Sequence, residues 1–129
     1  TNKRKIKADK FFKGMFETDL KKGELIEFVE FEVPEKSAYG KFPNPASRYA
    51  IVGVYVAKFK KEVRVALTGV ASCVFRCEKI EEVLSKNFSA SVIDNVNISS
   101  QGFNSDIHAS AEYRSHLIKV MAKKAVASC

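Results

Sequence analysis

The chain has 129 residues, a hydrophobic fraction of 46% and a formal net charge of +7. A chain of this size buries about two-thirds of its surface on folding, so we expect one domain whose core needs neither a disulfide nor a metal. No apolar run approaches the ~20 residues that cross a bilayer, and no signal core follows the basic N-terminus. We therefore expect a cytoplasmic protein without a membrane span, whose three cysteines are free thiols.

The basic charge is divided along the chain rather than gathered in one stretch. Residues 1–22 are basic, residues 23–37 are acidic, residues 38–76 are basic again, and the remainder is balanced. A nucleic-acid-binding protein concentrates its basic residues on one face. Binding of RNA or DNA through the basic N-terminal arm is therefore an alternative interpretation and not the leading one.

The N-terminal quarter predicts one short helix and one strand. Residues 8–16 contain clustered aromatic residues and a glycine, which are typical of a short helix or turn. In residues 25–33, Val29, Phe31 and Val33 alternate with Glu30 and Glu32, which predicts a half-buried strand. Glu27 breaks this alternation, which indicates a bulge or a later start of the strand. Pro34 is expected to end this strand because it cannot donate a ladder hydrogen bond.

The next third predicts a set of antiparallel strands. Residues 37–42 form a short candidate strand, and residues 43–47 form a loop because two prolines restrict their backbone. Residues 49–59 are nearly all apolar, which predicts a strand buried on both faces. Gly53 within it indicates a bulge or the close approach of another group. Residues 63–68 alternate in polarity and follow a short turn, which predicts an antiparallel hairpin.

Beyond residue 76 the apolar period changes from that of a strand to that of a helix. An amphipathic helix is expected over residues 76–88, and Ser89 is a candidate N-cap of a second short helix. A final helix is expected over residues 110–127. Strands followed by helices predict an α+β domain, an antiparallel sheet of three to four strands covered by about three helices.

The motifs alone identify neither a catalytic site nor a metal site. The six glycines are scattered and form no phosphate-binding loop, and His108 and His116 have no further ligand at metal-binding spacing. A nucleophilic pair of Cys73 or Cys77 with either histidine stays open, although Cys77 lies on an apolar helical stripe that favours core packing. We expect no catalytic residue, no metal ligand and no turnover by this chain alone.

Three stretches carry a resemblance to a known family. They are Ala8–Gly14 with Leu20–Ile26, then Ser37–Phe42 with Tyr49–Val54 and Val65–Ala71, and finally Ser105–Leu117. In this order and spacing the chain resembles the C-terminal domain of the FAD-binding (medium) subunit of molybdenum hydroxylases, the family of carbon monoxide dehydrogenase and xanthine dehydrogenase. The third stretch, with its Ser-Ala-Glu-Tyr-Arg-x-His-Leu core, is the most specific.

The resemblance implies a fold, a cofactor and partners. Residues 1–129 would be the small α+β C-terminal domain of a longer subunit whose upstream portion binds FAD. In this family a large subunit oxidises the substrate at its molybdenum cofactor. Electrons then pass through the iron–sulfur clusters of a small subunit to FAD and on to an external acceptor. The share of this domain would be to shape the flavin site and to help the subunits assemble.

The resemblance also implies one cofactor-binding residue. The family has a lysine in the segment that matches Tyr39–Phe42, so Lys41 would place a cation beside the pyrimidine edge of the isoalloxazine. A cation there stabilises the anionic reduced flavin and raises its potential. A solvated lysine at the end of a strand is the alternative. Arg48 stands where relatives often have an acidic residue, so the family's flavin contacts are not expected to be copied in full.

Two further expectations complete the sequence-based interpretation. Arg114, near the start of the last helix, is expected to pair with Asp106 or Glu112 and to lock that helix onto the preceding loop. A stand-alone assembly module is a third functional alternative, beside the flavoprotein domain and the nucleic-acid-binding module. It predicts self-association through an exposed apolar patch, whereas nucleic-acid binding predicts a steep salt dependence.

Overall fold

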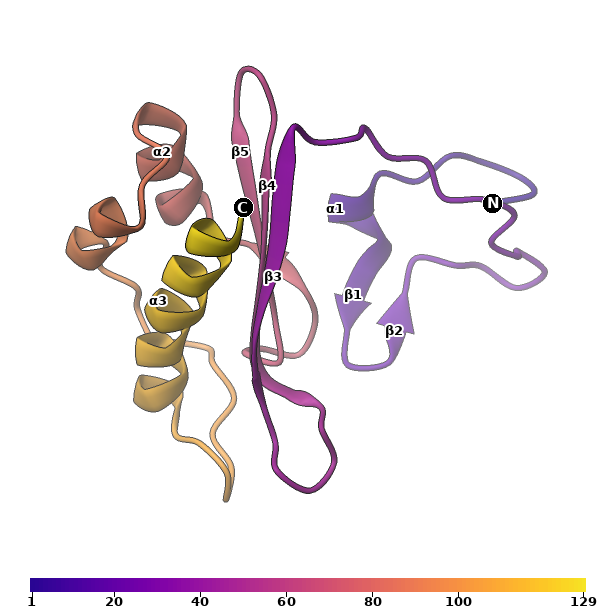
Figure 1. The fold of residues 1–129 in the computed structure, drawn as a ribbon. Helices are drawn as coiled ribbons and strands as arrows, with labels where there is room; N and C mark the ends of the chain where they lie inside the picture. Colours follow the sequence, from indigo (N-terminus) through magenta and orange to yellow (C-terminus); the bar gives the residue numbers. More distant parts are fainter. The chain divides into compact units, whose positions relative to one another are not determined.

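A computed structural model describes residues 1–129, which divide into two units, Thr1–Val33 and Pro34–Cys129 (Figure 1). The expectation of one domain over residues 1–129 stays a prediction, because units within a chain do not define the domains of a complete protein.

The larger unit is built on a four-stranded antiparallel sheet with the strand order β3-β4-β5-β6. The strands are β3 (Lys36–Pro43), β4 (Ala50–Lys58), β5 (Val63–Thr68) and β6 (Phe75–Arg76). The strands predicted over 37–42, 49–59 and 63–68 are confirmed, as is the hairpin that joins the last two. The sequence did not reveal β6, since two residues are too short to show a period.

Helices lie on one side of this sheet (Figure 1). They are α2 (Glu78–Lys86), the 3₁₀ helix η1 (Ala90–Asn95) and α3 (Ala111–Ser128). Helix α3 packs against β3 and β4, and α2 packs against β5. The hydroxyl of Ser110 caps α3 by accepting a hydrogen bond from the backbone N–H of Tyr113 at 3.2 Å. The predicted α+β class, with four strands and three helices, is confirmed.

The two faces of the sheet differ in character. Val52, Val54 and Val56 of β4 alternate toward the helices and are fully buried with their neighbours on β5 and α3. At Gly40, β3 approaches α3 so closely that a Cβ atom would clash with the carbonyl oxygen of Met121. The other face carries exposed side chains of all three long strands, and no helix of this unit lies on it.

Gly53 of β4 confirms the predicted close approach of another group. A Cβ atom there would clash with the hydroxyl of Tyr39, which reaches across from β3 on the face away from the helices. On this face the prediction that β4 is buried holds for Gly53 and Ala57 but not for Tyr55, which is 42% exposed. Tyr39 and Tyr55 are partners in the antiparallel register.

The smaller unit consists of short elements without a hydrophobic core. Helix α1 (Ala8–Phe11) confirms the helix expected there, and it leads into a hairpin of β1 (Phe12–Gly14) and β2 (Glu17–Thr18). All buried hydrophobic residues of the chain lie between Ile51 and Val126, in the larger unit. The only buried side chain of the smaller unit is Glu24.

The strand predicted over residues 25–33 is wrong for this structure. The segment carries no secondary structure, and the first long strand of the chain begins instead at Lys36. Its apolar side chains are open to solvent, with Val29, Phe31 and Val33 exposed by 76%, 78% and 80%. The alternation in the sequence is that of a half-buried strand. No neighbouring strand pairs with this segment, so its backbone forms no ladder hydrogen bonds.

Glu24 provides a testable acid-sensitive contact. The guanidinium of Arg4 donates to its carboxylate, Nε to Oε1, at 2.7 Å, and the backbone N–H of Lys21 donates to Oε2 at 2.8 Å. These bonds lower the pKa of Glu24 from 4.5 to about 2. Since the folded pKa is the lower one, the stabilisation is present above about pH 4.5 and is lost as the pH falls toward 2.

We expect an NMR titration of the Glu24 side-chain carboxyl to show a midpoint near pH 2. Arg4→Met should return the midpoint toward 4.5, because it removes the main donor. The matched control is Lys5→Met, which removes a cation that pairs with the exposed Glu30 and should leave the Glu24 midpoint unchanged. A midpoint near 4.5 in the unmodified chain would contradict the observed bonding.

Candidate functional site

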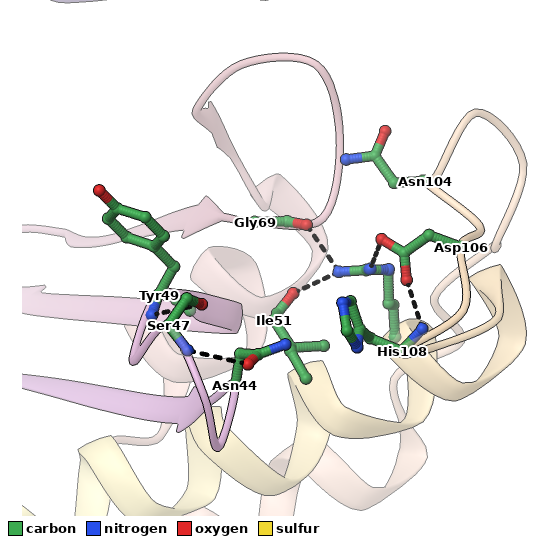
Figure 2. Close-up of a pocket in the computed structure, with 10 residues that line it drawn as sticks. Asn44, Ser47, Tyr49, Ile51, Gly69, Asn104, Asp106 and His108 are labelled. Atoms are coloured by element: carbon green, nitrogen blue, oxygen red, sulfur yellow. Dashed lines mark hydrogen bonds and ion pairs between the residues drawn. The ribbon is translucent and has the colours of Figure 1, made fainter.

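A cavity of about 220 Å³ lies at one end of the sheet in the larger unit (Figure 2). Its walls come from the loop between β3 and β4, the start of β4, the turn after β5 and the loop before α3. Figure 2 shows Asn44 and Ser47 on one side of it and Asp106 and His108 on the other. The cavity therefore gathers polar side chains that lie more than fifty residues apart in the sequence.

Arg114 of α3 holds these walls together. Its side chain is only 4% exposed, and Nη1 donates to the carbonyl oxygens of Ile51 at 2.6 Å and of Gly69 at 2.9 Å. Nη2 donates to the Asp106 carboxylate at 2.6 Å. The predicted ion pair is confirmed, and its partner is Asp106 rather than Glu112. One guanidinium thus joins α3, β4, the turn after β5 and the loop before α3.

Asp106 is held as an anion. Its Oδ1 accepts hydrogen bonds from the backbone N–H groups of His108 at 2.9 Å and Ala109 at 3.1 Å. The pKa of Asp106 is lowered mainly by the bond from His108. The bond from Ala109 and the positive charge of Arg114 lower it further. A carboxylate bound in this way does not exchange protons near neutral pH, so this pair serves as a structural clamp rather than as an acid or a base.

The loop between β3 and β4 has a fixed shape. The buried Asn44 accepts hydrogen bonds at Oδ1 from the backbone N–H groups of Ala46 at 2.9 Å and Ser47 at 3.1 Å. Its own N–H donates to the carbonyl of Tyr49 at 2.7 Å, and Arg48 adopts a left-handed backbone with φ of 64°. The two prolines predicted a loop here, but Asn44 was not predicted to organise it, although an asparagine beside proline is a recognised turn signal.

Lys41 lies on β3 and does not line this cavity. Its side chain is exposed, and Nζ donates to the backbone carbonyl of Arg48 at 3.4 Å, so it touches the same loop from the sheet side. Its register partner on β4 is Gly53, which presents no side chain. Lys41 therefore stands on the sheet face away from the helices, next to the Tyr39–Tyr55 pair.

Sequence reasoning did not anticipate that Tyr39 and Tyr55 accompany Lys41. The period-2 alternation of a strand does place Tyr39 on the same face as Lys41. Tyr55 was hidden in the apolar run of β4, and only the register shows that it lies opposite Tyr39. A face with a cation and two half-exposed aromatic rings is suited to bind a planar aromatic group that carries negative charge.

No hydrogen bond joins Cys73 or Cys77 to either histidine. Cys77 is buried, and burial raises the pKa of its thiol, which disfavours the nucleophilic thiolate. His108 and His116 are both exposed. No group of three or more His, Cys, Asp and Glu side chains is placed to hold a metal ion. None of the helices combines the length and the apolar character that crossing a membrane requires.

Comparison with known proteins identifies relatives for most of the chain. The model of the CO dehydrogenase flavoprotein C-terminal domain matches residues 37–129. The glyceraldehyde dehydrogenase medium chain of Sulfolobus acidocaldarius is 35% identical over 133 residues, which cover 95% of this chain and 47% of that protein. The nicotine 6-hydroxylase medium subunit of Paenarthrobacter nicotinovorans is 28% identical over 134 residues, 96% of this chain and 47% of that protein. The chain thus spans about half the length of these relatives, and no solved structure gives a significant match.

Proposed function

Because the chain belongs to the family of CO dehydrogenase flavoprotein C-terminal domains, we propose that it is the C-terminal part of the FAD-binding medium subunit of a molybdenum hydroxylase. The observation that carries this proposal is the family match together with alignment of almost the whole chain to two proteins named as medium subunits. Its partners would be the upstream FAD-binding portion, a large subunit with the molybdenum cofactor and a small subunit with iron–sulfur clusters. Three free cysteines are in keeping with a cytoplasmic enzyme.

In the complete subunit, FAD would supply the redox chemistry that passes electrons from the iron–sulfur clusters to an external acceptor. The residues of this chain fit a flavin on the sheet face of Lys41. Tyr39 and Tyr55 are half-exposed on that face, and the hydroxyl of Tyr39 lies over Gly53, the register partner of Lys41. Lys41 would hold a positive charge near the flavin, where it stabilises the anionic reduced form.

The basic N-terminal arm gives little support to nucleic-acid binding. Arg4 forms ion pairs with Asp19 and Glu24, and Lys13 lies 3.5 Å from Asp19. Side chains that pair with carboxylates of their own unit offer less charge to phosphate groups. The flavoprotein proposal needs no contribution from this arm.

The proposal is tested by replacing Lys41 with methionine in the complete medium subunit. We expect the reduction potential of bound FAD to fall by about 30 mV or more, which is a tenfold change for a two-electron couple. The physical reason is the loss of a cation that stabilises reduced flavin more than oxidised flavin. A redox titration followed by visible absorbance measures the potential.

Lys36→Met is the matched control, since Lys36 lies at the other end of β3 and the substitution removes the same charge. It should leave the potential unchanged. A Lys41→Met subunit that binds FAD at the unmodified potential would assign Lys41 to the solvated strand end instead. A complete subunit that binds no FAD would refute the proposed function itself.

A further inference from the structure

Residues 26–33 combine the sequence of a strand with the exposure of an unpaired chain. Val29, Phe31 and Val33 alternate with Glu30 and Glu32, as in a strand with one buried face. Yet no backbone N–H or carbonyl of residues 26–33 forms a hydrogen bond within the chain. Backbone groups next to apolar side chains are normally paired when those side chains become buried, so this segment has the properties of a strand without its sheet.

The unit that contains this segment cannot bury it. No hydrophobic side chain of Thr1–Val33 is buried, whereas six large apolar side chains within 25–33 are exposed by 54% to 80%. Monomeric proteins rarely leave so many neighbouring apolar side chains in solvent without a partner. A unit of this length is also too small to build a stable core without help.

The comparisons indicate where the missing partner lies. The C-terminal domain model begins at residue 37, so residues 25–33 precede that domain. Both relatives align with these residues as well, but about half of each relative lies outside the alignment. In a medium subunit, residues 25–33 would therefore adjoin the portion that precedes the C-terminal domain.

Pairing of this segment with the free edge of β3 is disfavoured by the connection. Only Pro34 and Glu35 separate Val33 from Lys36, so an antiparallel pair would need a two-residue hairpin loop. The favoured turns of such loops require a positive φ at their first residue, and proline is fixed near −65°. The backbone N–H of Glu35 instead donates to the carbonyl of Lys58 at 2.8 Å, which continues the pairing of β3 with β4.

Pairing of two copies is disfavoured by charge and by packing. The segment carries three glutamates and no basic residue, so two copies side by side would bring like charges together. A two-stranded ribbon would also leave Val29, Phe31 and Val33 without a layer to pack against. A larger sheet with its own core meets both requirements.

We propose that Phe28–Val33 forms a β-strand that adds to the edge of a sheet in the FAD-binding portion of the medium subunit. Val29, Phe31 and Val33 face the core of that portion, and Glu30 and Glu32 face away from it. The main chain supplies the ladder hydrogen bonds and the alternate apolar side chains supply the packing. This inference rests on the proposed function, because the partner is the portion of a medium subunit that precedes this chain.

Hydrogen–deuterium exchange with mass spectrometry tests the proposal on peptides that cover residues 24–34. It compares the complete medium subunit with the 129-residue chain. We expect amides of residues 26–33 to exchange without protection in the chain alone and about a hundredfold or more slowly in the complete subunit. Protection in both samples would indicate pairing within the chain, and protection in neither would indicate no strand; either result overturns the proposal.

Two variants of the complete subunit test the assigned faces. Phe31→Asp places a carboxylate on the proposed core face, and Glu32→Asp keeps one on the opposite face. We expect Phe31→Asp to speed exchange of residues 26–33 at least about tenfold and Glu32→Asp to leave it unchanged. Equal exchange in the two variants would overturn the assignment of Phe31 to the core face. The comparison of the unmodified proteins does not depend on whether either variant folds.

The FAD content of the same samples separates this inference from the proposed function. FAD bound to a complete subunit whose residues 26–33 exchange freely would overturn the strand and leave the proposed function standing. A protected segment in a complete subunit without FAD would support the strand and refute the function.

Discussion

Replacement of Arg114 with methionine should lower the free energy of unfolding of the larger unit by about 2–6 kcal/mol, because it leaves two backbone carbonyls without their donor at about 1–3 kcal/mol each. The guanidinium is almost fully buried and bonds two backbone carbonyls and the Asp106 carboxylate. Methionine fills similar space but leaves the carbonyls of Ile51 and Gly69 without their donor. An unsatisfied buried acceptor costs more than the bond itself contributes.

Chemical denaturation followed by circular dichroism measures this loss. Arg64→Met is the matched control, because Arg64 pairs with Glu62 where both side chains are nearly half exposed. An exposed pair of this kind contributes no more than about 1 kcal/mol. Equal destabilisation by the two substitutions would show that Arg114 is not the clamp that its hydrogen bonds indicate.

Replacement of Gly40 with valine is expected to destabilise the larger unit by about 3 kcal/mol, near the upper end of the usual cost of overpacking a core. Valine is favoured in strands, so its strand propensity alone would predict stabilisation rather than this loss of stability. The cause is the close approach of β3 and α3, since even a Cβ atom would clash with the backbone carbonyl of Met121. Neither backbone can yield without separating the helix from the sheet.

The same denaturation measurement applies to Gly40→Val. Ser37→Val serves as its control, because it introduces the same side chain into the same strand at an exposed position on the opposite face. We expect a change within about 0.5 kcal/mol there. A stable Gly40→Val protein would mean that β3 and α3 do not approach as closely as described.

Short-range sequence patterns predicted the helices and strands whose formation depends mainly on residues close together in the chain. The final helix could be placed from its apolar stripe, and the central strands from their apolar content and short turn. The clamp could be predicted only in part. The pairing of Arg114 with Asp106 spans 8 residues and was anticipated, whereas its bonds to Ile51 and Gly69 span 63 and 45 residues and have no sequence signal.

Residues 25–33 show why a correct pattern can give a wrong structure. Alternation records which face of a segment is meant for a core, but it does not say which residues supply that core. Lys41 shows the complementary case. The resemblance alone singled it out, and only the register of β3 with β4 places it beside two tyrosine rings.

The internal bonding of the loop after β3 bears on how this family can vary in length. Asn44 fixes the number of residues between the two strands, because its amide oxygen must reach two successive N–H groups. One added residue would displace the carbonyl that Lys41 contacts and reshape the cavity wall as well. Insertions and deletions should therefore be rare in the loop between β3 and β4. They should accumulate instead around Gly102, where an added Cβ atom would meet no atom of a non-neighbouring residue within 4 Å.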